Sequence, residues 1–306
     1  MKINRHDNGP VFIVGRYFCD LVFTGLPELP RLGHEVYASN FDLVPGGVAT
    51  PAIALSRLGL DVIWSCEFGI DPFSQFVKKE VLSAGVDGAY FTDSSHPFLR
   101  ITVAFSFQDE RAFLSYSDPL PALPNARVIR ETHPKWVYIT HLMSGSDQEQ
   151  IVEAAREVGA HVFMDCQAHA LSIGDLLVGD ALGRVDVFSP NLGEALALTG
   201  ELGIEQALKK LLCYTPLVII KDGAHGCLAG NSQGIIRSDA LDVVVKDTTG
   251  AGDNFNCGFI YAQIRGYSLE QSLRFANICG GLSTRGLGGS AASPTPEEIL
   301  AYLKIL

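Results

Sequence analysis

The stretch that decides the fold reads DTTGAGDNFNCG and covers residues 247–258. A strand-like segment precedes it, and apolar residues at helical spacing follow it, so it is expected to open a helix over residues 251–264. Gly250 and Gly252 leave backbone N–H groups uncovered at the positive end of that helix. Such a turn can bind phosphate, or the charge that develops on a phosphoryl group during its transfer.

Asp253 lies in the same turn. A carboxylate there could accept the proton of a substrate hydroxyl as that hydroxyl attacks the γ-phosphate. Amides for the anion and a base for the nucleophile are what phosphoryl transfer requires of a protein. A structural interpretation is also open, in which Asp253 stabilises the first turn of the helix and the glycines only permit a tight turn. A bare GxGD pattern would favour the structural interpretation.

Strands and helices alternate along the rest of the chain. A strand over residues 11–15 precedes a helix that begins with an N-cap and a first-turn proline, Thr50 and Pro51, and ends at Gly59. The unbroken apolar character of the strands predicts an α/β fold, a mostly parallel sheet covered by helices on both faces. Further strands are expected at 61–65, 135–140, 161–165, 185–188, 217–221 and 241–245, and further helices at 72–84, 148–158, 192–199, 269–282 and 296–305.

Two segments interrupt this alternation, because residues 35–44 and 98–116 carry no helical pattern. In the second, apolar and polar residues alternate on both sides of a turn at residues 108–110, which predicts an antiparallel hairpin. We therefore expect one domain over residues 1–306, with a small inserted β-sheet from about 16–44 and 96–118. The sheet is interpreted as a lid over the site, with a flap or a homodimer contact as the alternative.

Composition excludes several classes of protein. Of 306 residues, 47% are hydrophobic and 19% are charged, so the chain can bury a large core. The formal charge of −11 and the lack of a basic run argue against nucleic-acid and membrane partners. The polar start and the seven cysteines without a CxxC pair predict a reduced, cytoplasmic protein without a signal peptide. The histidines form no zinc-like pattern.

The stretch over residues 247–258 resembles the second signature of the PfkB carbohydrate kinase family, which has the ribokinase-like fold. The one departure is Cys257, where a smaller residue is usual, and the resemblance covers essentially the whole chain. It implies an ATP-dependent kinase that phosphorylates a hydroxyl of a small sugar-like substrate. Asp253 would be the general base, and the amides of Gly250, Ala251 and Gly252 the anion hole. A nucleoside kinase of the same fold and a catalytically silent sensor remain alternatives.

The resemblance also implies where the acceptor binds. The glycine pair Gly46–Gly47 and Asp20 would hold the sugar, since a carboxylate can accept two hydrogen bonds from vicinal hydroxyls. Thr50 stands where the family has Asn, and it is either a helix cap or an acceptor contact. Arg16 has no assigned role. The lid is rich in aromatic residues, which could either stack on a nucleoside base or pack against one another. They are Phe18, Phe23, Phe98, Phe105, Phe107, Phe113 and Tyr116.

ATP, Mg²⁺ and a monovalent cation such as K⁺ are implied in the same way. Asn191 and Glu194 match the Asn-x-x-Glu motif whose Glu organises Mg²⁺ through water, although the same spacing is also a helix capping box. Asp165 is a weaker candidate for the phosphate and metal region. Nucleotide contacts are expected from Asn191, Lys221, Gly223, Gly226, Thr248 and Asn277. Contacts to the monovalent cation are expected from Asp247, Thr249 and Ser290, the last in the loop 286–290.

Overall fold

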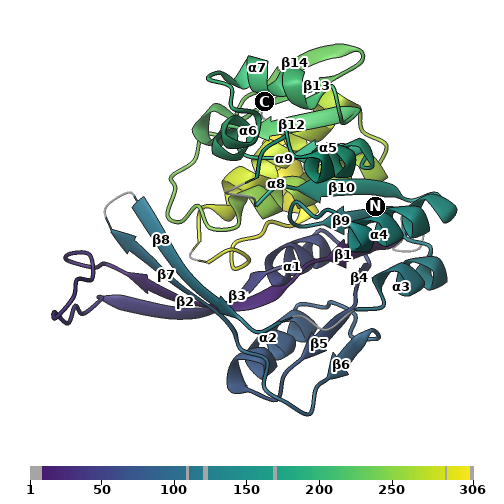
Figure 1. Ribbon diagram of the computed structural model, residues 1–306. Helices are drawn as coiled ribbons and strands as arrows, with labels where there is room; N and C mark the ends of the chain where they lie inside the picture. Colours follow the sequence, from purple (N-terminus) through teal and green to yellow (C-terminus); the bar gives the residue numbers. More distant parts are fainter. Residues whose placement is uncertain (1–8, 108–109, 120–122, 168–170, 287, 304–306) are drawn as a thin grey trace.

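The computed structural model describes residues 9–107, 110–119, 123–167, 171–286 and 288–303 (Figure 1). Its centre is an eight-stranded sheet in the order β14-β13-β12-β11-β10-β9-β1-β4. The strands from β4 across to β12 run parallel, and the hairpin β13–β14 is antiparallel. The strands are β1 (Val11–Val14), β4 (Val62–Trp64), β9 (Trp136–Ile139), β10 (His161–Asp165), β11 (Val187–Ser189), β12 (Leu217–Lys221), β13 (Cys227–Asn231) and β14 (Gly234–Ser238).

Helices cover both faces of this sheet, as predicted. Successive residues of a strand point to opposite faces, so Ile13 of β1 joins one core and Phe12 the other. The first core packs against α1 (Ala49–Arg57), α2 (Pro72–Ser83), α8 (Ala251–Ile264), α9 (Leu269–Ser283) and α10 (Pro296–Leu303). The second packs against α3 (Asn125–Thr132), α4 (Ser146–Glu157), α5 (Leu176–Gly183), α6 (Leu192–Thr199) and α7 (Ile204–Leu211).

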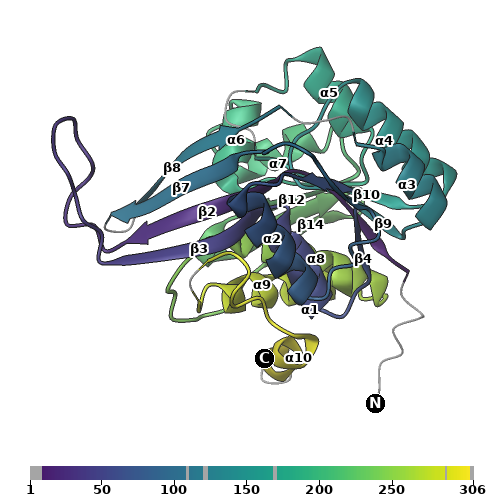
Figure 2. The same ribbon diagram turned by 90° about the horizontal axis from the view of Figure 1, so that it is seen from below.

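The two non-helical segments form one separate sheet, in the order β3-β2-β7-β8. The strands are β2 (Tyr17–Thr24), β3 (Asn40–Gly47), β7 (Arg100–Phe107) and β8 (Glu110–Ser117), and they project away from the central sheet (Figure 1, Figure 2). The expected antiparallel pairing of β7 with β8 is confirmed, while residues 108–109 of the turn lie outside the described residues. A two-stranded pair, β5 (Cys66–Phe68) and β6 (Phe91–Asp93), was not predicted.

Two local expectations are wrong. The segment 241–245 is not a strand, and its residues instead line a cavity beside α8 and α9. Thr50 does not cap α1, because the helix begins two residues earlier, with Val48 in the N-cap position and Thr50 already inside the helix. Within the part of the chain that the structure describes, none of the helices has the length and apolar character that crossing a membrane would require.

Candidate active site

The turn that opens α8 requires glycine at its first position. Gly250 adopts φ +69°, and a Cβ atom there would lie 2.6 Å from the Cα of Gly289. The side-chain amide of Asn254 closes the turn by donating to the carbonyls of Gly250 (2.9 Å) and Gly289 (3.0 Å). The backbone thus brings the positive end of α8 against the loop at residues 288–290 without an intervening side chain.

Asp253 occupies the first turn of α8. Its pKa is raised from an ordinary 3.8 to about 7, first because burial disfavours the charged form and then because Asp165 repels it. The ammonium group of Lys221 opposes this rise, while Asp20 and Glu194 add to it. A carboxylate with a pKa near neutrality can accept a proton from a hydroxyl and release it again, which suits a general base.

A polar network lies beneath this turn. Lys221 Nζ contacts Asp165 Oδ1 at 2.8 Å, and the pair is largely buried. The side-chain amide of Asn256 donates to Asp165 Oδ2 (2.7 Å) and to the hydroxyl of Tyr138 (3.0 Å). Lys221 also donates to Asn256 Oδ1 at 3.4 Å. The sequence stretch contains Asn256, but its partners on β9, β10 and β12 could not be read from it.

The predicted acceptor residues meet at the base of β2 and β3. Asp20 pairs with Val44 across these strands, and a Cβ at Gly46 would lie 2.1 Å from Asp20 Oδ2. Burial raises the pKa of Asp20 to about 7, and a hydrogen bond from Thr102 opposes the rise. Gly47 has φ +58°, and a Cβ there would lie 2.2 Å from a backbone oxygen, so the glycine pair brings the backbone close to Asp20.

Thr50 lies beside the anion hole. It is buried, its hydroxyl lies 3.5 Å from the carbonyl of Pro45, and Cβ atoms at Gly250 and Gly289 would each lie 2.9 Å from its Cγ2. The capping interpretation fails because Val48 takes the N-cap position without a side-chain hydrogen bond. Contact of Thr50 with the acceptor stays a prediction.

A cavity of about 500 Å³ borders the opposite side of the turn. Its wall includes Gly252 and Phe255 of α8 and the segment 241–245. Asn277 also faces β14, because its amide donates to the carbonyl (3.1 Å) and hydroxyl (3.0 Å) of Ser238. Five of the six residues predicted for the nucleotide meet here, namely Lys221, Gly223, Gly226, Thr248 and Asn277, whereas Asn191 caps α6 and does not line this cavity.

Asn191 and Glu194 form the capping box of α6. The Asn191 side chain accepts from the Glu194 amide, and the Glu194 carboxylate accepts from the Asn191 amide, both at 2.8 Å. Glu194 also contributes to the raised pKa of Asp253, which places its charge near the anion hole. The described residues contain no group of three or more His, Cys, Asp or Glu arranged as a metal site.

The loops expected to hold a monovalent cation are tied to one another. Asp247 Oδ1 accepts from the amide (2.8 Å) and hydroxyl (2.7 Å) of Thr249, and Oδ2 accepts from the Gly288 amide (2.8 Å). The carbonyl of Ser290 accepts from Arg57 Nη1 at 2.8 Å. These groups therefore lie together beside the anion hole, while Leu287 of the same loop lies outside the described residues.

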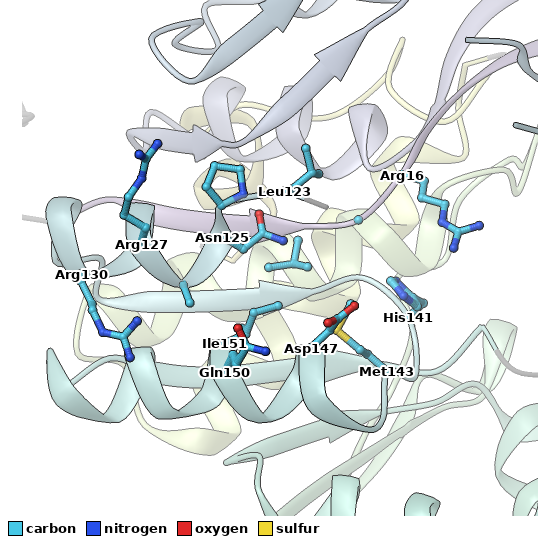
Figure 3. Close-up of a pocket in the computed structure, with 14 residues that line it drawn as sticks. Arg16, Leu123, Asn125, Arg127, Arg130, His141, Met143, Asp147, Gln150 and Ile151 are labelled. Carbon is cyan, nitrogen blue, oxygen red and sulfur yellow. The ribbon is translucent and has the colours of Figure 1, made fainter. Parts of the chain in front are cut away.

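A second cavity, of about 820 Å³, opens where β1 and β9 end (Figure 3). Arg16 and His141 line it, together with residues of α3 and α4. The sequence assigns no role to Arg16, and His141 belongs to none of the histidine patterns typical of zinc sites. Only the adjacency of β1 and β9 in the sheet brings these two residues to the same edge.

The match of a family model to residues 20–296 shows that the chain belongs to the pfkB family of carbohydrate kinases. It is therefore a carbohydrate kinase with a ribokinase-like fold. A ribokinase of Lactococcus lactis is 27% identical over 97% of both chains. The structure of an Arabidopsis thaliana ribokinase with ribose and ATP has a TM-score of 0.83 at 22% identity over 97% of this chain and 99% of that one. A putative ribokinase II of E. coli with ATP and Mg²⁺ has a TM-score of 0.77 at 20% identity, covering 97% and 100%.

Proposed function

We propose that this kinase transfers the γ-phosphoryl group of ATP to a hydroxyl of a small sugar-like acceptor, with Asp253 as the general base. The observation that carries the proposal is the turn at the start of α8. It combines uncovered amides, a carboxylate with a pKa of about 7 and a cavity of about 500 Å³ on one side. On its other side lie Thr50 and, beyond it, the glycine pair with Asp20. Donor and acceptor would thus approach one carboxylate from opposite sides.

Each residue then has a defined task. Asp20 accepts hydrogen bonds from acceptor hydroxyls, and the Gly46–Gly47 backbone lets the acceptor approach closely. Asp253 accepts the proton of the attacking hydroxyl. The amides of residues 250–252 stabilise the charge on the transferring group, because they are fixed by the glycine turn before the reaction starts. Lys221, whose Nζ would lie 3.6 Å from a Cβ at Gly252, holds Asp165 and keeps the pKa of Asp253 from rising further.

The residues present fit a bound magnesium ion. The charges of Asp165, Asp20 and Glu194 each raise the pKa of Asp253, and a divalent cation would offset that repulsion. Mg²⁺ in phosphoryl transfer needs few protein ligands, because phosphates and water supply the rest, and it neutralises phosphate charge when bound. Glu194 would orient its water shell. Asp247, Thr249 and Ser290 would hold a monovalent cation that steadies the neighbouring amides.

The separate sheet would act as a lid. Asp20 and Thr102 lie opposite each other in register on β2 and β7, so closure of the sheet would bring both onto the acceptor. Contact between two lids would form the homodimer considered from the sequence, since β8 exposes Leu114 (70%) and Tyr116 (59%).

A nucleoside acceptor remains the second candidate within this fold. Two of the aromatic rings already have partners, since Phe23 packs on Phe41 and Phe98 lies under the guanidinium of Arg100. Phe113 and Tyr116 are each 59% exposed and could cover a base. A screen of free sugars, sugar acids, sugar phosphates and nucleosides for ATP-dependent phosphorylation tests the proposal. Absence of turnover with every class, by protein that binds ATP, would contradict it.

A further inference from the structure

The cavity at the ends of β1 and β9 has chemically distinct ends (Figure 3). Arg16 and His141 lie together at one end, Arg127 and Arg130 lie at the other, and Asp147 lies between them. The Arg16 end lies at the carboxyl edge of the central sheet, just after β1 and β9. Arg16 is four residues before Asp20, so this end of the cavity is next to the segment that carries the proposed acceptor residues.

The three arginines differ in whether the guanidinium group already pairs with a carboxylate. Arg130 forms an ion pair with Glu157, and Arg127 pairs with Glu131 at 3.6 Å one turn along α3. Arg16 is exposed, and no carboxylate or carbonyl of the described residues accepts a hydrogen bond or ion pair from its guanidinium. Of these three charges, only that of Arg16 remains for a ligand.

The backbone of Arg16 is part of the acceptor cradle. Its carbonyl accepts from the Val48 amide at 2.8 Å, and it is the oxygen that a Cβ at Gly47 would meet at 2.2 Å. The Arg16 main chain therefore borders the proposed acceptor cradle, and its side chain starts from the edge of that cradle.

His141 adds a hydrogen-bond donor beside this charge. Burial lowers its pKa first, the positive charge of Arg16 lowers it further, and Asp165 opposes both. His141 is therefore neutral at pH 7 and presents one ring N–H and one ring acceptor. The charges of Arg16 and of Asp165, a member of the network under Asp253, both act on the His141 imidazole.

We infer that the acceptor is anionic, a sugar-like molecule whose carboxylate or phosphate binds the Arg16 guanidinium with His141 as a second donor. This inference rests on the proposed function, because it assumes that the acceptor's hydroxyl faces Asp253. Asp20 and Asp253 would repel an anion, and the chain as a whole is acidic, so a local cation is needed to hold one. A guanidinium binds either anion with two parallel N–H bonds. Asp147 also lines the cavity and carries a carboxylate, so the guanidinium of Arg16 would be needed to hold an anion there.

The test compares kcat/KM for matched acceptors with wild type, Arg16→Gln and the control Arg127→Gln. The acceptors are a neutral sugar, the corresponding sugar acid and the corresponding sugar phosphate, and the two anions show which source the site prefers. Wild type is expected to favour one anion over the neutral sugar. Arg16→Gln should lower that preference about 10- to 100-fold, mainly through KM, because charge-assisted bonds are lost. Arg127→Gln should leave the preference unchanged, since its partner is Glu131.

Two results would overturn the inference. Wild type that prefers the neutral sugar would show that the acceptor is not anionic, and an unchanged preference in Arg16→Gln would remove Arg16 from recognition. In both cases phosphorylation that still requires Asp253 would leave the proposed function standing. Absence of turnover with every acceptor would contradict both this inference and the proposed function. Arg16→Lys keeps the positive charge but cannot make two parallel N–H bonds to the anion, so it should give an intermediate preference. This variant replaces Arg16→Gln in the test if Arg16→Gln does not fold.

Discussion

Replacing Asp253 by Asn should inactivate the enzyme and also make the fold more stable at alkaline pH. The pKa of Asp253 rises from 3.8 to about 7 in the folded protein, which corresponds to roughly 4 kcal/mol at 1.36 kcal/mol per tenfold change. Partial solvent exposure and the lost attraction to the helix dipole reduce this to about 1–3 kcal/mol. Because the folded pKa is raised, the folded state binds more protons between pH 4 and 7, and the free energy of unfolding falls as pH rises through that window.

Asn cannot ionise, so the variant does not lose the stability that wild type loses when the buried Asp253 becomes charged. Above pH 7 its free energy of unfolding in urea should exceed that of wild type by about 1–3 kcal/mol, and the difference should shrink toward pH 4. Its kcat should fall by about 10²- to 10⁴-fold with little change in the KM for ATP, because only the proton acceptor is lost. Wild-type kcat/KM should itself fall about tenfold per pH unit below pH 7, as the base becomes protonated.

A matched control is Glu270→Gln, which removes an exposed acid from the first turn of the neighbouring helix α9. Its stability should change by less than about 0.5 kcal/mol and its kcat should not change, because no buried charge is involved. A well-folded Asp253→Asn variant with near-normal kcat would refute the reasoning. It would leave Asp253 as a helix-start acid and the amides of the turn as the only catalytic groups.

Three further outcomes are expected. Lys221→Met leaves Asp165 buried and unpaired, so the free energy of unfolding should fall by about 3 kcal/mol. The acid limb of kcat/KM should move to higher pH, because Lys221 lowers the pKa of Asp253; an unmoved limb would show that the two groups are uncoupled. Turnover should be faster in K⁺ than in a large organic cation at matched ionic strength, and equal rates would exclude a working cation loop. Sedimentation velocity should show a dimer that Leu114→Lys dissociates; a monomeric wild type would contradict pairing through the lid.

The sequence determines whatever depends on short-range geometry. The bounds of α8 and α6 agree with the pattern to the residue, and glycine is demanded at Gly250 by its positive φ. The apolar strands predict a parallel sheet, because alternating β and α segments need both faces covered. The alternation in β7 similarly predicts a sheet outside the central one. Each of these conclusions uses residues no more than about a dozen positions apart.

The tertiary structure decides what depends on distant segments meeting. Thr50 has the chemistry of a cap, yet packing of its methyl group near Gly250 and Gly289 places it inside α1. The segment 241–245 has strand composition, but none of the described strands pairs with it, and Leu241, Asp242, Val243 and Val245 instead line the cavity of about 500 Å³. Propensity is a weak local preference, and tertiary contacts override it.

The chemistry of the site also depends on distant segments of the chain meeting in the folded protein. Asp165 and Lys221 are 56 residues apart in sequence, and only the parallel order of β10, β11 and β12 brings their side chains to one edge. The raised pKa of Asp253 comes from burial and from charges on several of these elements. Sequence can therefore identify the carboxylate, whereas its proton affinity follows from desolvation and long-range charge, which exist only in the folded chain.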